Sequence, residues 1–155
     1  MNAHRYSSVL LATIGVILMA MGLYFIFLRP ALLPEDLRYM HASLTEIRGA
    51  VPGLLEWLPK VFWVLGGYIF TTGVLTLYIA LTTFRAGSRP SVILVTFAGL
   101  SSIGWMVAVN FLIDSAFKWP LAGIAVLWAL AVALSWIEGH KRPFGLLRGA
   151  RIGEL

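Results

Sequence analysis

Four long apolar runs without a charged residue constrain this chain more than any other feature of its sequence. The runs cover residues 8–28, 61–84, 91–113 and 121–137, and none contains Lys, Arg, Asp or Glu. A helix needs roughly 20 residues to cross a hydrocarbon core of about 30 Å, and each run has about that length. The sequence therefore predicts an all-α integral membrane four-helix bundle, with residues 1–155 as a single transmembrane domain.

The composition agrees with this interpretation. The chain is 59% hydrophobic and only 12% charged, with a mean hydropathy of +0.86. A soluble domain is roughly 45–50% apolar and about 25% charged, so a water-soluble fold of this length could not bury so much apolar surface. The sequence has no cysteine, which excludes disulfides, thiolate metal sites and cysteine nucleophiles.

Glycines recur at a fixed spacing in the first two runs. Gly15 and Gly22 are seven residues apart, and so are Gly66 and Gly73. Seven residues make about two helical turns, so each pair lies on one face of its helix. Because glycine has no side chain, these faces permit the backbone of a neighbouring helix to approach closely.

The basic residues predict how the chain is oriented. The first run is too long for the apolar part of a signal peptide, so we expect it to remain as a span. Four spans then place both termini and the turn at residues 85–89 on one side of the membrane. That side carries most of the basic residues: Arg5, Arg85, Arg89, Lys141, Arg142, Arg148 and Arg151. By the positive-inside rule we expect both termini in the cytoplasm and the protein in a bacterial inner membrane.

The loop between the first two runs has a pattern of its own. A proline and two acidic residues at positions 34–36 are typical of a helix start. Apolar residues then recur at three- and four-residue steps, at Leu37, Met40, Leu44, Ile47 and Val51. This periodicity predicts one amphipathic helix over residues 34–48 in a long first extracytoplasmic loop. Two interpretations stay open, a lid over the bundle and a connector that packs its apolar stripe against lipid.

The end of the third run becomes polar toward the outer surface. Asn110, Asp114 and Lys118 are spaced four residues apart and share one face if the helix continues. The predicted loop helix lies near this end and adds further polar side chains. We therefore predict an outward-facing polar pocket with the candidate residues Asn110, Asp114, Lys118, His41, Arg38 and Glu35. The alternative is structural: Asn110 bonds a neighbouring helix, and Asp114 pairs with Lys118.

Motifs for catalysis or cofactor binding are missing from the sequence. It has no P-loop, no GxSxG elbow and no dinucleotide fingerprint, and its three histidines are scattered. We therefore expect no cofactor, no bound metal and no nucleic-acid partner. The basic tail at residues 138–155 is expected to lie in the cytoplasm and to bind anionic lipids.

Two stretches carry a resemblance to known proteins. Residues 32–40, LLPEDLRYM, and residues 102–114, which begin SIGWM and include Asn110, Phe111 and Asp114, resemble a set of bacterial membrane proteins of similar size and uncharacterised activity. The layout is also similar, in size and number of spans, to DoxX-type four-helix membrane proteins. The resemblance implies a four-helix membrane fold and assigns no chemical role to any residue.

Taken without structure, these patterns favour a protein that binds rather than catalyses. The bound molecule would be a membrane partner, a lipid or a small hydrophobic ligand. Trp105 and Trp128 lie deep in their runs, where each either packs in the core or lines such a cavity. One alternative is a small transporter or channel subunit that acts as a homo-oligomer. Another is a membrane enzyme that uses Asp114 and His41 at the outer surface.

Overall fold

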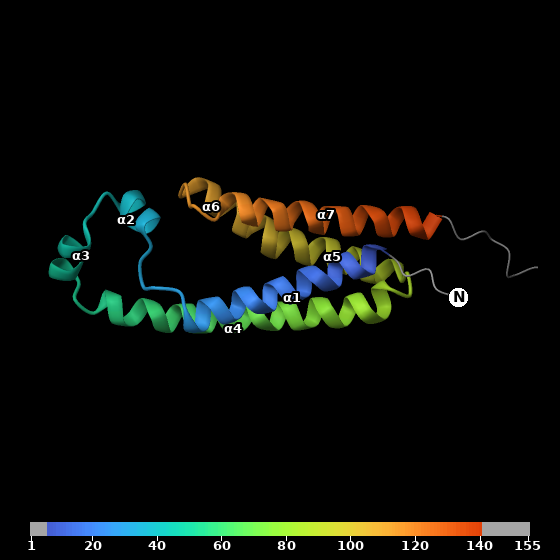
Figure 1. Cartoon of the computed structure of the whole chain (residues 1–155), viewed down its shortest axis with the longest axis horizontal. Helices are drawn as coiled ribbons and strands as arrows, with labels where there is room; N and C mark the ends of the chain where they lie inside the picture. The colour runs from blue at the N-terminus through green and yellow to red at the C-terminus, as the bar shows by residue number, and fades with distance from the viewer. Residues whose placement is uncertain (1–5, 141–155) are drawn as a thin grey trace, which may run out of the picture.

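The computed structural model describes residues 6–140, which form helices and contain no strand (Figure 1). Four helical segments are long and apolar enough to cross a membrane, so the predicted helical class and the number of candidate spans are confirmed for these residues. The segments are α1 (Tyr6–Phe27), α4 (Leu54–Ile79) with the π-helix η1 (Ala80–Phe84), α5 (Arg89–Gly99) with the π-helix η2 (Leu100–Gly104) and α6 (Trp105–Leu112), and α7 (Lys118–His140).

The helices extend beyond the apolar runs, most clearly at the start of α4. The second run begins at residue 61, whereas α4 begins at Leu54 and contains Pro59. Proline removes one backbone hydrogen bond, and the loss is small near a helix end, where solvent reaches the free carbonyl. Pro90 and Pro120 instead occupy the second and third positions of α5 and α7, as expected for helix starts.

The spaced glycines form the contact between α1 and α4, which lie side by side in Figure 1. A Cβ atom added to Gly22 would lie 2.6 Å from the backbone nitrogen of Phe70. A Cβ atom on Gly73 would lie 2.7 Å from the carbonyl oxygen of Gly15. The two backbones therefore touch, as the heptad spacing predicts, and we call this contact the glycine seam.

A second interface joins α5 to α7. The indole of Trp128 is 5% exposed, and its Nε1–H donates to the carbonyl of Val95 at 3.0 Å. Gly99 makes room for this ring, because a Cβ atom there would overlap the indole. Trp128 therefore belongs to the core, together with Ile14 of α1 and Phe84 of η1.

The predicted single helix over residues 34–48 is wrong, because the structure has two short helices there. These are α2 (Pro34–Met40) and α3 (Leu44–Ala50), separated by His41 in the left-handed backbone conformation, with φ 53°. Ser43 then starts α3: its Oγ accepts from Glu46 N at 3.2 Å, and its N–H donates to Glu46 Oε2 at 2.7 Å. This reciprocal cap fixes a new helix start at a place where the apolar stripe alone predicts continuity.

Polar contacts define the two ends of the bundle. Ser7 Oγ donates to Glu138 Oε2 at 2.6 Å, and Ser8 Oγ donates to the carbonyl of Ala80 at 2.5 Å. The start of α1 therefore meets the start of η1 and the last turns of α7. At the other end lie α2, α3 and the loop at residues 113–117, and we call this the α2 end. Of the basic tail expected at 138–155, residues 141–155 lie outside the described part of the chain.

Candidate functional site

A cavity of about 700 Å³ lies in the bundle toward the α2 end. It separates the α1–α4 pair from η2 and α6, since α4 packs on α1 while α6 packs on α7. Its walls are mainly apolar and aromatic, from residues spread over four segments. They include Leu18, Met21, Tyr24 and Phe25 of α1; Phe62, Leu65, Tyr68 and Ile69 of α4; Ile103 of η2 with Trp105, Met106 and Val109 of α6; and Leu121 of α7.

The cavity opens sideways between α4 and α6. Tyr68 on α4 and Trp105 on α6 line it, and these residues are 71% and 72% exposed. Leu65 and Val109 on the same two helices are also both exposed and part of the lining. These side chains therefore form the rim of a lateral opening. The sequence leaves open whether Trp105 and Trp128 pack in the core or line a cavity. In the structure Trp105 lines the cavity and Trp128 packs in the core.

The π-helix η2 forms part of the cavity wall. Ser101, Ser102 and Ile103 of this helix line the cavity. Ser102 Oγ donates to the carbonyl of Ala98 at 2.5 Å, so its hydroxyl is satisfied by its own segment. A π-helix places an additional residue in the turn, and such bulges occur frequently at functional sites.

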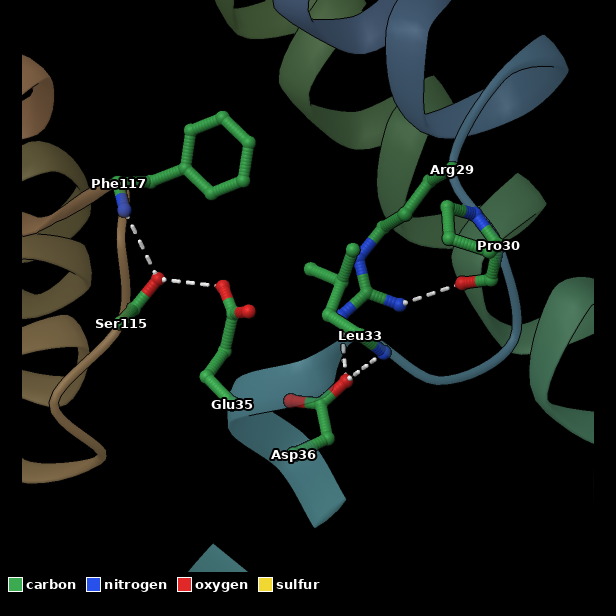
Figure 2. Close-up of polar contacts among 7 residues, drawn as sticks. All are labelled: Arg29, Pro30, Leu33, Glu35, Asp36, Ser115 and Phe117. Carbon is green, nitrogen blue, oxygen red and sulfur yellow. Dashed lines mark hydrogen bonds and ion pairs between the residues drawn. The ribbon is translucent and has the colours of Figure 1, made fainter. Parts of the chain in front are cut away.

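Polar groups gather at the α2 end of the cavity. Arg29, Glu35, Asp36 and Ser115 line it there (Figure 2), and so does Asn110. They come from the segment after α1, the first turn of α2, α6 and the loop before α7. One end of an otherwise apolar cavity is therefore polar, and this end carries both positive and negative formal charges.

Three nearby groups hold the Arg29 side chain in place. Its Nη2 lies 3.6 Å from Asp36 Oδ2, and its Nη1 donates to the carbonyl of Pro30 at 3.3 Å. The guanidinium stacks over the ring of Phe62, 3.5 Å from the ring centroid. Burial lowers the pKa of Arg29, and the opposing influence of Asp36 is smaller. Asp36 Oδ2 also accepts from the N–H of Leu33 at 2.8 Å, which fixes the carboxylate at the start of α2.

Glu35 is the most buried charged side chain of the site. The residue is 4% exposed, and its Oε1 accepts from Ser115 Oγ at 3.1 Å. Ser115 Oγ in turn accepts from the N–H of Phe117 at 3.1 Å, which orients the hydroxyl toward the carboxylate. Among residues 6–140, no Lys or Arg side chain forms an ion pair with Glu35. A buried carboxylate thus faces the cavity with a neutral hydroxyl as its partner.

The structure divides the residues that the sequence proposed for an outer pocket. Glu35 and Asn110 line the cavity. Asp114 and Lys118 pair with each other outside it, where the Asp114 side chain is 71% exposed. The hydrogen bond and charge of Lys118 lower the pKa of Asp114. Arg38 and His41 are exposed on α2 and at its end, away from the cavity lining.

The predicted continuous row from Asn110 to Lys118 does not form, because α6 ends at Leu112. Asp114 has a left-handed backbone, with φ 51°, so it leaves the face that carries Asn110. The amide of Asn110 donates to the carbonyl of Met106 at 2.9 Å, within its own helix. The expected bond from Asn110 to a neighbouring helix is therefore replaced by a bond to its own backbone.

Two charged or polar residues at the α2 end of the cavity were not candidates on sequence grounds: Arg29 and Ser115. Asp36 belongs to the acidic helix start that the sequence shows beside Glu35, among the polar side chains expected near the pocket. Arg29 only marks the end of the first run, and Ser115 lies in a loop without a local signal.

Comparisons with known proteins add no relative to this geometry. No protein-family model, no curated protein and no solved structure matches the chain. Within residues 6–140, no cluster of three or more His, Asp or Glu side chains could hold a metal ion. The cavity and its polar end are therefore the features from which a function must be argued.

Proposed function

We propose that the protein is a small multi-pass membrane protein that binds a lipid or another small hydrophobic molecule without catalysing a reaction. The observation that carries this proposal is the cavity of about 700 Å³, which is apolar along its walls and polar at one end. Sites for small molecules are typically concave and mainly apolar, with a few polar groups that fix orientation, and hold roughly 300–1,000 Å³.

The proposed setting is a bacterial inner membrane with both termini in the cytoplasm. Arg85 lies in the turn at the end opposite α2, and Arg89 begins α5 there, so by the positive-inside rule both support this orientation. In this orientation α2, α3 and the polar end of the cavity lie at the outer surface. The apolar walls then run inward from the headgroup level of the outer leaflet.

The lateral opening supports entry of the ligand from the bilayer. The rim residues Leu65, Tyr68, Trp105 and Val109 would face acyl chains rather than water. An amphipathic molecule could therefore slide its apolar part between α4 and α6 without leaving the membrane. Its polar group would stop at the α2 end, where polar side chains line the cavity.

Native mass spectrometry of the protein, released gently from its own membrane, tests this proposal. Wild-type protein is expected to carry a discrete additional mass. Val109→Trp places a large side chain in the lining and is expected to lose that mass. Val126→Trp makes the same change on α7, at a residue that is 58% exposed and outside the lining, and should keep it. A wild-type chain without any bound molecule would contradict the proposal.

A further inference from the structure

The formal charges at the polar end of the cavity do not balance. Asp36 and Glu35 carry two negative charges, and Arg29 carries one positive charge. We propose that the ligand is a hydrophobic amine, in which a cationic ammonium group is attached to a single apolar chain or ring system. Its ammonium group would lie against Glu35, and its apolar part would lie between α4 and α6. This inference rests on the proposed function and specifies its ligand.

Arg29 is already engaged and does not present a free cation to an anionic headgroup. Its side chain is 11% exposed and lies between Asp36, the carbonyl of Pro30 and the ring of Phe62. An anionic ligand that approached Arg29 would also meet two carboxylates. In a site shielded from water, such like-charge proximity is costly. Anionic amphiphiles are therefore disfavoured.

Glu35 provides the place for a cation. Its carboxylate is almost completely buried, and Ser115 contributes a neutral donor rather than a positive charge. Figure 2 shows this carboxylate lying between Ser115 on one side and the Arg29 segment on the other. Glu35 forms no direct ion pair within residues 6–140, and Arg29 acts on it only at longer range. An ammonium group from the ligand in direct contact would therefore lower the cost of burying this carboxylate.

Aromatic rings in the lining of the cavity add to the preference for a cation. Tyr24 and Phe117 both line the cavity, and their ring centroids are 6.4 Å apart. Phe117 follows Ser115 by two residues, so its ring belongs to the same polar end. The faces of aromatic rings attract ammonium groups electrostatically, most strongly where water is excluded.

The volume of the cavity favours a single-chain or ring-bearing amine over a phospholipid with two acyl chains. About 700 Å³ is a volume typical for drug-sized molecules. A zwitterionic phospholipid would in addition bring its phosphate close to Asp36 and Glu35. The charge pattern and the size of the cavity therefore point to the same class of ligand.

Three probes with the same ten-carbon chain test the inference: decyltrimethylammonium, decanol and decyl sulfate. The full chain is purified in dodecyl maltoside, whose micelles carry no charge, and binding is measured by native mass spectrometry over a titration. We expect the cation to bind wild-type protein about tenfold more tightly than decanol, and decyl sulfate to bind most weakly. Val109→Trp should reduce binding of both decyltrimethylammonium and decanol.

Glu35→Gln keeps an oxygen for Ser115 and removes the charge. The tenfold preference for the cation should disappear in this variant, while decanol binds as before. Glu46→Gln, at an exposed position on α3, serves as the matched control and should leave the preference unchanged.

The outcomes separate this inference from the proposed function. Equal binding of cation and alcohol, both sensitive to Val109→Trp, would overturn the amine and leave the cavity function intact. Preference for decyl sulfate would overturn the inference as well. If no probe binds in a manner sensitive to Val109→Trp, the proposed function itself fails.

Displacement of decyltrimethylammonium by phosphatidylethanolamine would identify a membrane lipid as the source of the ammonium group, and it would overturn the single-chain assignment. The comparison of the three probes in wild-type protein decides the question even if Glu35→Gln does not fold.

Discussion

The two sides of α4 differ in how closely a neighbouring helix approaches them. On one side Gly66 and Gly73 meet the backbone of α1 directly. On the other side Leu65, Tyr68 and neighbouring large side chains face α6 across the cavity. The same helix therefore packs tightly against α1 on one side and lines a cavity on the side that faces α6.

This difference shows that side-chain size, rather than hydrophobicity, decides where these helices pack. Both sides of α4 are apolar. In a bilayer, lipid tails are as apolar as the helix faces, so hydrophobicity gives little drive for one helix to contact another. Small residues permit dense contact and strong dispersion attraction, whereas bulky residues next to polar groups keep the helices apart. Substitutions at both interfaces of the bundle and outside them test this difference.

Gly22→Ala, on α1, tests the side of α4 that packs against α1. The added methyl group would meet the backbone of Phe70 and Gly66 on α4, and a backbone cannot rotate away. We expect the free energy of unfolding, measured in mixed micelles, to fall by about 3 kcal/mol. Gly67→Ala is the matched control, because a Cβ atom there has no neighbour within 4 Å. Equal losses in both variants would show that close approach does not hold the seam together.

Gly99→Ala asks whether the same rule holds between α5 and α7. Its methyl group would overlap the indole of Trp128 and disturb the bond to the Val95 carbonyl. A side chain can shift more readily than a backbone, so we expect a loss of about 2 kcal/mol in the same unfolding assay. Gly123→Ala on α7 has open space around its Cβ position and should cost little. A Gly99→Ala protein as stable as wild type would refute the rule at this interface.

Ser43→Ala probes the segment outside both sides of α4. The change removes the hydroxyl that caps α3, while the Ser43 N–H still donates to Glu46. We expect amide hydrogen exchange in residues 44–50 to become about fivefold faster, without change in α1 or α4. Faster exchange throughout the bundle would show that α3 is coupled to the seam.

The same cap predicts a dependence on pH. The N–H of Ser43 first, and then its hydroxyl, lower the pKa of Glu46. Because the pKa of Glu46 is lower in the folded state, the stabilisation of α3 is fully present above the pKa of the unfolded state, about 4.3. This stabilisation is lost as pH falls through the pKa of the folded state. In Ser43→Ala the pKa of Glu46 should rise only part of the way to its unfolded value, because the backbone N–H of residue 43 still donates to the carboxylate. Carbon NMR titration of the Glu46 carboxylate measures this rise, and an unchanged pKa would contradict the assignment.

Asn110→Leu has the smallest expected effect and tests the open side of α4. The amide of Asn110 bonds to its own helix, so its loss leaves no unpaired group on another helix. We expect the free energy of unfolding to change by no more than about 0.5 kcal/mol. A large loss would show that Asn110 joins α6 to a neighbour, as the sequence alone suggests.

The sequence predicts the spans and the glycine seam well because both depend on local properties. Length without charge defines a span, and a seven-residue spacing defines a face. It fails at residues 34–48 because the apolar stripe continues across the break at His41. The signal for that break was present in Ser43 and Glu46, whose three-residue spacing is that of a capping box.

The site is harder to predict because it depends on segments that meet only in the folded chain. Glu35 and Ser115 are 80 residues apart, and no local pattern pairs them. Arg29 would pass as an ordinary charge at the end of a span. The cavity itself depends on the separation between α4 and α6, and helical periodicity specifies the face of a residue but not that distance.

The glycine seam has a consequence for the order in which this protein can assemble. Its two helices, α1 and α4, are the first two spans in the chain, so they are synthesised before α5, α6 and α7. During synthesis, N-terminal units can fold before the rest of a chain exists. The seam can therefore form early as a hairpin on which the later helices dock. The lining of the cavity also includes residues of η2 and α6 and Leu121 of α7, so the cavity is enclosed only after the fourth helical segment has begun to form.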